Sequence, residues 1–126
     1  MAKKDNLSST IVYGKRQKGG GSEVPSALNA SLKVVSGKDA GKSFRLTAAN
    51  TVIGRGDQAD VRIDDEGSSR QHAAVVYRNL EFRVKDLDSA NGTFLNGSEV
   101  KEYALRSGDK IAVGGTILQF RVEEGD

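Results

Sequence analysis

From residue 31 onward, the chain consists of short runs of β-forming residues separated by turns rich in glycine and asparagine. The Asn96-Gly97 pair is typical of a tight hairpin, and Gly114-Gly115 and residues 37–41 also predict turns. No window of ten or more residues has the periodicity of an amphipathic helix. The pattern therefore predicts an all-β domain, a sandwich or barrel of about ten short strands. We expect these strands at residues 31–35, 43–46, 51–53, 61–63, 73–78, 81–85, 93–95, 110–113 and 116–122.

The composition is that of one soluble globular domain. The chain has 126 residues, of which 37% are apolar and 29% charged, and its net charge is only +2. A near-neutral domain lacks the basic surface expected of a nucleic-acid-binding module. There is no apolar run long enough to cross a membrane and no cysteine for disulfides or a sulfur-based metal site, and we expect no secretory signal. We therefore expect a cytoplasmic protein that binds neither nucleic acid nor membranes and uses no cofactor.

Residues 1–30 differ from the rest of the chain in composition. They carry five Lys and Arg side chains against two acidic ones, and residues 15–22 are rich in glycine. Such a stretch is typical of a flexible linker. One apolar island interrupts it, at Ile11, Val12 and Tyr13. We predict a disordered N-terminal tail over residues 1–30 and a folded domain over residues 31–126.

Polar motifs in a fixed order lie at the ends of the predicted strands. They are Gly54-Arg55, then residues 69–72 (Ser-Arg-Gln-His), residues 86–93 (Asp-Leu-Asp-Ser-Ala-Asn-Gly-Thr), and Asn96-Gly97. Turns at one end of a sandwich can converge and bring together two guanidinium groups, a serine hydroxyl with its backbone N–H, and an amide. Guanidinium groups stay charged and offer a planar set of donors, while an amide both donates and accepts. The set predicts a site for an anionic group, built from Arg55, Ser69, Arg70 and Asn91.

The sequence gives little support for other chemistry. His72 is the only histidine, and no nucleophile–base pair or metal-ligand set accompanies it. Gly92 is expected in a turn that requires positive φ, and Thr93 in a structural role. The acidic residues do not follow the spacing of a calcium loop, so we interpret them as solvated turn residues: Asp57, Asp60, Asp64, Asp65, Asp86 and Asp88. We predict that the chain is not an enzyme and has no metal site.

The four motifs, in this order and on strand ends, resemble those of the forkhead-associated (FHA) domain over residues 31–124. The resemblance implies a β-sandwich of eleven strands whose loops at one end bind phosphothreonine peptides without catalysis. It also implies that Arg55, Ser69 and Arg70 hold the phosphate and that Asn91 pairs with the peptide backbone. Just before Asn91 the family often has a hydroxyl residue, whereas this chain has Ala90. Four residues would support the binding loops: Gly54, His72, Gly92 and Thr93.

The resemblance further implies a place in Ser/Thr kinase signalling. The partners would be a kinase and either a phosphothreonine-containing protein or the chain's own phosphorylated tail, as in small bacterial FHA proteins. Thr10 resembles such a tail site, with Tyr13 at the third position after it, where the family often sets peptide preference. About 21 residues separate Thr10 from the predicted domain, a flexible span of roughly 25 Å. The alternative is a phosphate-independent scaffold or assembly domain, for which Ala90 leaves room.

Overall fold

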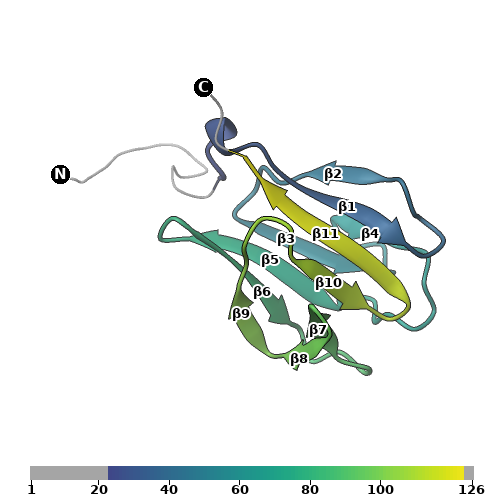
Figure 1. The fold of residues 1–126 in the computed structure, drawn as a ribbon. Coiled ribbons are helices and arrows are strands. Elements are labelled where there is room, and N and C mark those ends of the chain that lie inside the picture. Colours follow the sequence, from purple (N-terminus) through teal and green to yellow (C-terminus); the bar gives the residue numbers. More distant parts are fainter. Residues whose placement is uncertain (1–22, 124–126) are drawn as a thin grey trace.

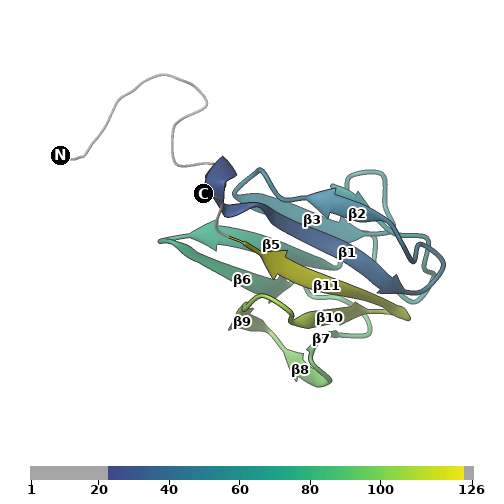
Figure 2. The same ribbon diagram turned by 45° about the horizontal axis from the view of Figure 1, so that its top comes forward.

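The computed structural model describes residues 23–123. In this part of the chain, eleven strands form two packed sheets, preceded by a short 3-10 helix, η1 (Ser26–Leu28) (Figures 1 and 2). The six-stranded sheet has the order β2 (Ser43–Arg45), β1 (Ala30–Ser36), β11 (Thr116–Val122), β10 (Lys110–Val113), β7 (Thr93–Leu95), β8 (Ser98–Val100). The five-stranded sheet has the order β4 (Val61–Arg62), β3 (Asn50–Gly54), β5 (Ala73–Arg78), β6 (Glu81–Asp86), β9 (Glu102–Ala104). The predicted all-β sandwich is confirmed.

Alternating residues of the strands fill the space between the two sheets. Leu118 and Phe120 of β11 are fully buried, and Leu32 of β1 lies opposite Phe120 in the antiparallel register. From the other sheet, the Phe82 ring lies 5.0 Å from the Phe120 ring at an interplanar angle of 56°, a favourable tilted arrangement. Because side chains alternate between the faces of a strand, the same pattern leaves every second residue outside.

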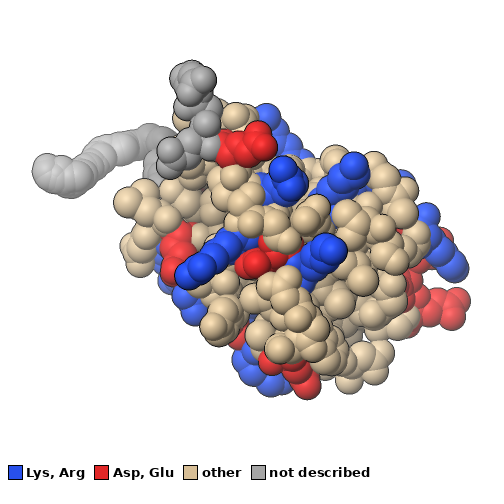
Figure 3. Space-filling model, in the orientation of Figure 1, with Lys and Arg blue, Asp and Glu red and all other residues tan. Residues whose placement is uncertain are grey.

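Charged side chains cover the outer faces of both sheets. Figure 3 shows Lys and Arg gathered over β1, β2 and β11 of the six-stranded sheet, with acidic side chains among them. On the five-stranded sheet, Arg83 of β6 forms ion pairs with Glu81 (3.0 Å) and with Glu102 of the neighbouring β9 (2.9 Å). Exposed pairs of this kind contribute little to stability. The sandwich is therefore stabilised mainly by its apolar interior.

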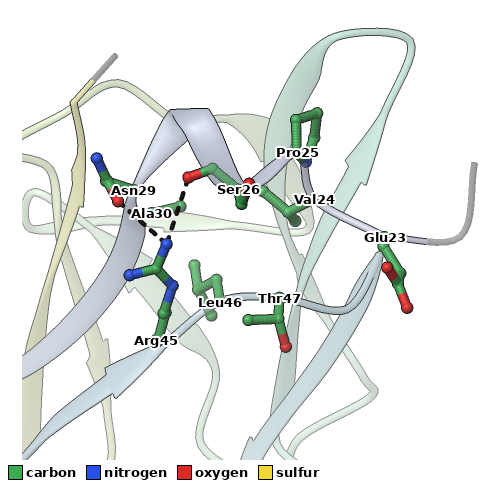
Figure 4. A pocket seen from close by; sticks show the side chains of 9 residues that line it. All are labelled: Glu23, Val24, Pro25, Ser26, Asn29, Ala30, Arg45, Leu46 and Thr47. Atoms are coloured by element: carbon green, nitrogen blue, oxygen red, sulfur yellow. Dashed lines mark hydrogen bonds between the residues drawn. The ribbon is translucent and has the colours of Figure 1, made fainter. Parts of the chain in front are cut away.

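The folded part begins before residue 31, the boundary predicted from the sequence. Val24 is buried, and its N–H donates to the carbonyl of Thr47 at 2.8 Å. Arg45 of β2 donates to Asn29 Oδ1 (3.0 Å) and to the Ser26 carbonyl (3.3 Å), which attaches η1 to the sheet (Figure 4). Residues 23–30 thus pack on the sandwich. The sequence places them in the tail because they contain few apolar residues. The rest of the predicted tail, with Thr10, lies outside the described residues.

The sequence pattern does not predict β8 and β9. Each has only three residues, and exposed polar side chains such as Ser98 and Glu102 hide the alternation. A single residue, Lys101, separates them as the chain crosses from the six-stranded to the five-stranded sheet. Within residues 23–123, no helix has the length and apolar character needed to span a membrane.

The two ends of the sandwich carry different segments of the chain. At one end lie the end of β3, the start of β5, the end of β6 and the β10–β11 turn (Figures 1 and 2). At the opposite end lie the β5–β6 hairpin and the beginning of the described chain at Glu23. The motifs with Arg55, with residues 69–72 and with residues 86–93 fall at the first end, which is called the motif end below. The Asn96-Gly97 pair instead forms the β7–β8 turn at the other end of β7, where Asn96 hydrogen-bonds to Asp109 and Lys110 at the start of β10.

Candidate functional site

At the motif end, β3 and the loop between β4 and β5 approach each other very closely. A Cβ on Gly54 would overlap the carbonyl oxygen of Arg70 and would lie 2.8 Å from that of Ser69. The next two residues hydrogen-bond to these same carbonyls, Arg55 N–H to Ser69 (3.2 Å) and Gly56 N–H to Arg70 (3.1 Å). The missing side chain at position 54 is what lets the two segments meet. Glycine here brings Arg55 next to Ser69.

His72 joins the segments of the motif end to one another. It is fully buried; its Nδ1 accepts from the Ser69 N–H (2.9 Å), and its Nε2 donates to the Gly92 carbonyl (2.8 Å). Its backbone N–H donates to Ile53 of β3, and its carbonyl accepts from Leu87. The neutral ring with a proton on Nε2 fits both contacts. His72 thus fixes the β4–β5 loop against β3 and the β6–β7 loop.

The contact with His72 changes the expected role of Ser69. The sequence suggests that this serine offers both its hydroxyl and its backbone N–H to an anion. In the structure the N–H is already donated to His72 Nδ1, so that donor is not available. Only the hydroxyl of Ser69 remains for a ligand.

Asp86, at the end of β6, organises the β6–β7 loop. Its carboxylate accepts from the Ser89 hydroxyl (2.6 Å), the Ser89 N–H (3.2 Å) and the buried Thr93 hydroxyl (2.7 Å). Burial raises the pKa of Asp86, but these hydrogen bonds outweigh it and hold the pKa below its ordinary value. The interpretation of Asp86 as a solvated turn residue is therefore wrong. The same loop places Gly92 at φ +91, as expected for a turn glycine.

Two further carboxylates connect the β4–β5 loop to its neighbours. Asp65 accepts from the Gly115 N–H (2.9 Å) and the Thr116 hydroxyl (2.6 Å) of the β10–β11 turn, and from Gly67 N–H (2.8 Å). Asp39, from the β1–β2 turn, accepts from the Asp64 N–H at 2.7 Å. Asp65 is half-buried and hydrogen-bonded, so its interpretation as a solvated turn residue is wrong, and no sequence motif points to Asp39. An aspartate two residues before glycine is a local turn signal, but the contacts that join separate loops have partners distant in sequence.

The bonds to Asp86 predict a defined loss of stability in acid. Because the folded pKa of Asp86 lies below the unfolded one, the unfolded chain binds more protons as the pH falls below about 4, and stability decreases. Asp86→Asn should lower the free energy of unfolding at pH 7 by about 1–3 kcal/mol. Its difference from the wild type should shrink in acid, as measured by urea midpoints between pH 7 and pH 3. Asp88→Asn, an exposed change in the same loop, is the control, and an equal loss there would contradict the prediction.

Three side chains of the motif end each use one atom to hold a loop and have further polar atoms without a partner among residues 23–123. Arg55 Nε donates to the Ser68 carbonyl (2.8 Å), which leaves its two terminal nitrogens. Ser69 Oγ accepts from the Ala90 N–H (3.0 Å) and keeps its own proton to donate. Asn91 Nδ2 donates to the Gly67 carbonyl (2.8 Å), so its Oδ1 is still an acceptor. The structure thus brings these predicted residues together in one cluster.

The remaining predicted residues lie around this cluster. Arg70 is exposed and forms no side-chain hydrogen bond with residues 23–123, so its guanidinium adds a second cation beside Ser69. Ala90 is exposed next to Asn91 and supplies a backbone N–H but no hydroxyl. Among the described residues, no group of three or more His, Cys, Asp or Glu side chains is arranged to hold a metal ion. The cluster is suited to bind an anion and an adjacent peptide group.

Comparison with known proteins agrees with this geometry. The family model of the FHA domain matches residues 51–114. The chain is 39% identical over 92 residues to the glycogen accumulation regulator GarA of Mycobacterium tuberculosis, covering 73% of this chain and 57% of GarA. It is 36% identical over 100 residues to the oxoglutarate dehydrogenase inhibitor of Corynebacterium glutamicum, covering 79% of this chain and 70% of that protein. The chain thus spans little more than half the length of GarA.

Solved structures give the same answer. An FHA domain from a study of phosphothreonine-dependent FHA interactions superposes with a TM-score of 0.70 at 32% identity, covering 75% of this chain and 97% of that one. The FhaA FHA domain, solved in complex with the intracellular domain of Rv3910, gives a TM-score of 0.67 at 33% identity, covering 73% and 99%. The sequence motifs, the two-sheet sandwich and these matches together show that the chain belongs to the FHA domain family.

Proposed function

We propose that this chain is a phosphothreonine-peptide-binding module of Ser/Thr kinase signalling, acting in the cytoplasm and not as an enzyme. One observation carries the proposal. Arg55, Ser69 and Asn91 are tied to loop carbonyls or N–H groups through one atom each, and their remaining donors and acceptor lie in the same cluster. Such an arrangement binds a ligand without having to order its side chains first, which favours affinity.

The free atoms match the chemistry of a phosphorylated threonine. A phosphate carries nearly two negative charges and three strong acceptor oxygens. The terminal nitrogens of Arg55, the Ser69 hydroxyl and the Arg70 guanidinium supply charged or polar donors for it. Asn91, with a free acceptor and one free N–H, is suited to a backbone group next to the phosphorylated residue. The buried contacts of His72 with Ser69 and Gly92, and of Thr93 with Asp86, hold the loops that carry these groups in place.

Recognition of the threonine methyl group would add only modest selectivity. Burial of one methyl is worth about 0.8 kcal/mol, or roughly a fourfold preference over phosphoserine. A larger preference would require the methyl to be enclosed tightly by the loops. The phosphate and the backbone contact therefore supply most of the affinity in this proposal.

The names of the relatives and structural neighbours support a regulatory role. One neighbouring FHA domain was solved with the intracellular domain of another protein, and two relatives are named as a regulator and an enzyme inhibitor. We propose a phosphorylated protein and its Ser/Thr kinase as partners of this chain. The chain's own Thr10, which lies outside the described residues, is a second candidate ligand.

The distance between Thr10 and the site allows self-binding. Thirteen positions separate Thr10 from Glu23, where the described chain begins at the end opposite the motifs. Extended, they reach about 43 Å, whereas a six-residue strand such as β5 is about 20 Å long. The tether is shorter than the one predicted from a boundary at residue 31, and it is still long enough to pass along the sandwich.

A phosphate-independent assembly function is the second candidate. Ala90 favours it, because the hydroxyl that often precedes the asparagine in this family is missing. The Corynebacterium glutamicum relative, named as an oxoglutarate dehydrogenase inhibitor, also suggests a metabolic enzyme as a partner. Under this candidate, the loops would bind an unmodified protein surface.

Titration with peptides distinguishes these possibilities. We expect phosphothreonine peptides from a library to bind, and the same peptides without phosphate not to bind, as followed by calorimetry or NMR. A peptide of residues 5–15 phosphorylated on Thr10 tests the tail in the same experiment. Library binding without tail binding would retain the phosphothreonine reader and exclude the tail as its ligand. If phosphate changed the affinity of no peptide, the phosphate-independent candidate would replace the proposal.

A further inference from the structure

The β5–β6 hairpin has leucine at a turn position where both backbone and solvent disfavour it. Asn79 and Leu80 have φ angles of +55° and +65°, and the Leu80 side chain is 88% exposed. For a residue with a branched side chain, the left-handed conformation costs about 1–2 kcal/mol, and glycine or asparagine is the usual choice. Folding alone therefore gives no reason for Leu80. An unfavourable conformation of this kind is often retained because it serves a function. For Leu80 we infer that its side chain makes a contact with another segment or molecule.

Leu80 borders an apolar hollow at the end of the sandwich opposite the motifs. The hollow lies between the hairpin, the start of β3 and the beginning of the described chain. Its apolar lining consists of Pro25, Ala49, Val76, Tyr77 and Leu80, and polar residues that include Glu23 and Arg78 border it. Val76 and Tyr77 are half-buried, and the Tyr77 ring packs 4.7 Å from that of the core residue Phe82. The hollow thus has a wall supported by the core and an exposed leucine at its edge.

We propose that this hollow binds the apolar island Ile11-Val12-Tyr13 of the same chain. Residues 1–22 continue directly from Glu23, which itself lines the hollow. Apart from this island the segment from Lys3 to Ser22 is polar or glycine, with Leu7 as the one exception. Two β-branched residues and an aromatic side chain are the groups that an apolar surface next to a strand accommodates well.

The segment between Tyr13 and Glu23 is long enough to reach the hollow and short enough to keep the island close to it. Ten positions separate Tyr13 from Glu23, which gives a flexible mean span of about 17 Å and an extended reach of about 33 Å. A tether of this length supplies an effective concentration of about a millimolar. A contact with a dissociation constant of about 0.1 mM is then about nine-tenths occupied within the molecule.

Docking would have a consequence for Thr10, which immediately precedes Ile11. It would keep Thr10 at the hairpin end, away from Arg55, as long as the island stays in the hollow. The inference concerns the unphosphorylated chain and needs no phosphate site. It therefore stands or falls separately from the proposed function.

NMR of the unphosphorylated full chain tests the contact directly. Changing Ile11, Val12 and Tyr13 together to serine should shift the backbone amides of Val76, Tyr77 and Asn79 and leave those of Arg55 and Asn91 unchanged. Leu7→Ser, a change of one apolar residue outside the island, is the matched control and should shift neither group. Unchanged amides around the hollow in the triple variant would overturn the inference.

A second variant tests the hollow from the other side. Leu80→Gly removes the side chain but suits the left-handed backbone, so the hairpin should fold at least as well. We expect trypsin to cleave after Lys15, Arg16 and Lys18 about tenfold faster in this variant, because cleavage follows the undocked population. Tyr103→Ser, which removes an exposed aromatic side chain from β9, should leave the rate unchanged. Equal rates in all three proteins, or protection that depends on protein concentration and so indicates a second copy, would overturn the inference.

Discussion

Replacing Arg55 by alanine is expected to weaken phosphothreonine-peptide binding about a hundredfold or more, with little change in the fold. Each hydrogen bond between charged groups contributes about 1.5–3 kcal/mol, and the two free terminal nitrogens of Arg55 can make two of them. The side chain is exposed, and its one bond within the described residues is to the Ser68 carbonyl. Calorimetric titration of the purified variant measures the loss, and thermal unfolding verifies that the domain remains folded.

Two matched variants show whether the effect belongs to the site. Arg78→Ala removes the same type of side chain from the end of β5, opposite the motifs, and should bind as the wild type does. Arg55→Lys keeps a positive charge but loses the planar fork and the Nε bond to Ser68, so it should lie between wild type and alanine. If Arg55→Ala bound phosphopeptides as tightly as the wild type, the phosphate would not bind at Arg55 and the proposed site would be wrong. Equal binding of modified and unmodified peptides would favour the assembly function.

The strands rich in apolar and β-branched residues are those that the sequence predicts. Residues 73–78 and 116–122 are predicted with the bounds that β5 and β11 have in the structure. A run of β-forming residues bounded by turn residues is a local signal, and it needs no knowledge of which strands pair. β8 and β9 give no such signal, because each has three residues and exposed polar side chains. Their strand conformation follows from pairing with β7 and β6, which a single sequence does not display.

The candidate site divides in the same way. Arg55, Ser69 and Asn91 stand out in the sequence because their residue types suit an anion and their order fits successive turns. The groups that hold them do not stand out. Asp65 receives hydrogen bonds from Thr116, 51 positions later, and His72 contacts Gly92, 20 positions later. Which N–H groups are already used, as at Ser69, depends on such contacts and was therefore beyond prediction.

A division of labour follows from these contacts. The groups that connect the loops, such as His72 and Asp86, are buried and hydrogen-bonded. The groups left for a ligand belong to exposed residues, apart from the half-buried Ser69. Buried polar groups need such partners, since an unpaired one costs stability. The loops can then be held rigid without using the atoms that recognise a phosphate. Mutations of residues that connect the loops should therefore change stability and binding together. Mutations of residues left for the ligand should change binding alone.

Among mutations that change both stability and binding, Gly54→Ala is expected to have the largest effect. A Cβ at this position would overlap the Arg70 carbonyl oxygen and crowd that of Ser69, and both are backbone atoms that cannot rotate away. The strand and the loop would have to separate, with loss of the Arg55 N–H and Gly56 N–H hydrogen bonds. We expect a loss of about 3 kcal/mol in the free energy of unfolding and at least a tenfold loss of phosphopeptide affinity. Urea unfolding and calorimetric titration measure the two quantities.

Gly41→Ala separates this steric effect from the general cost of replacing a turn glycine. Gly41 has a φ of +101° and open space around its Cβ position, so alanine there meets backbone strain without a clash. It should cost about 1 kcal/mol and leave peptide affinity unchanged, because the added Cβ would meet no atom of the β4–β5 loop. Equal losses of stability in the two variants would mean that β3 and the loop can separate at little cost. In that case Arg55 would not depend on Gly54 for its position, and affinity in Gly54→Ala should survive.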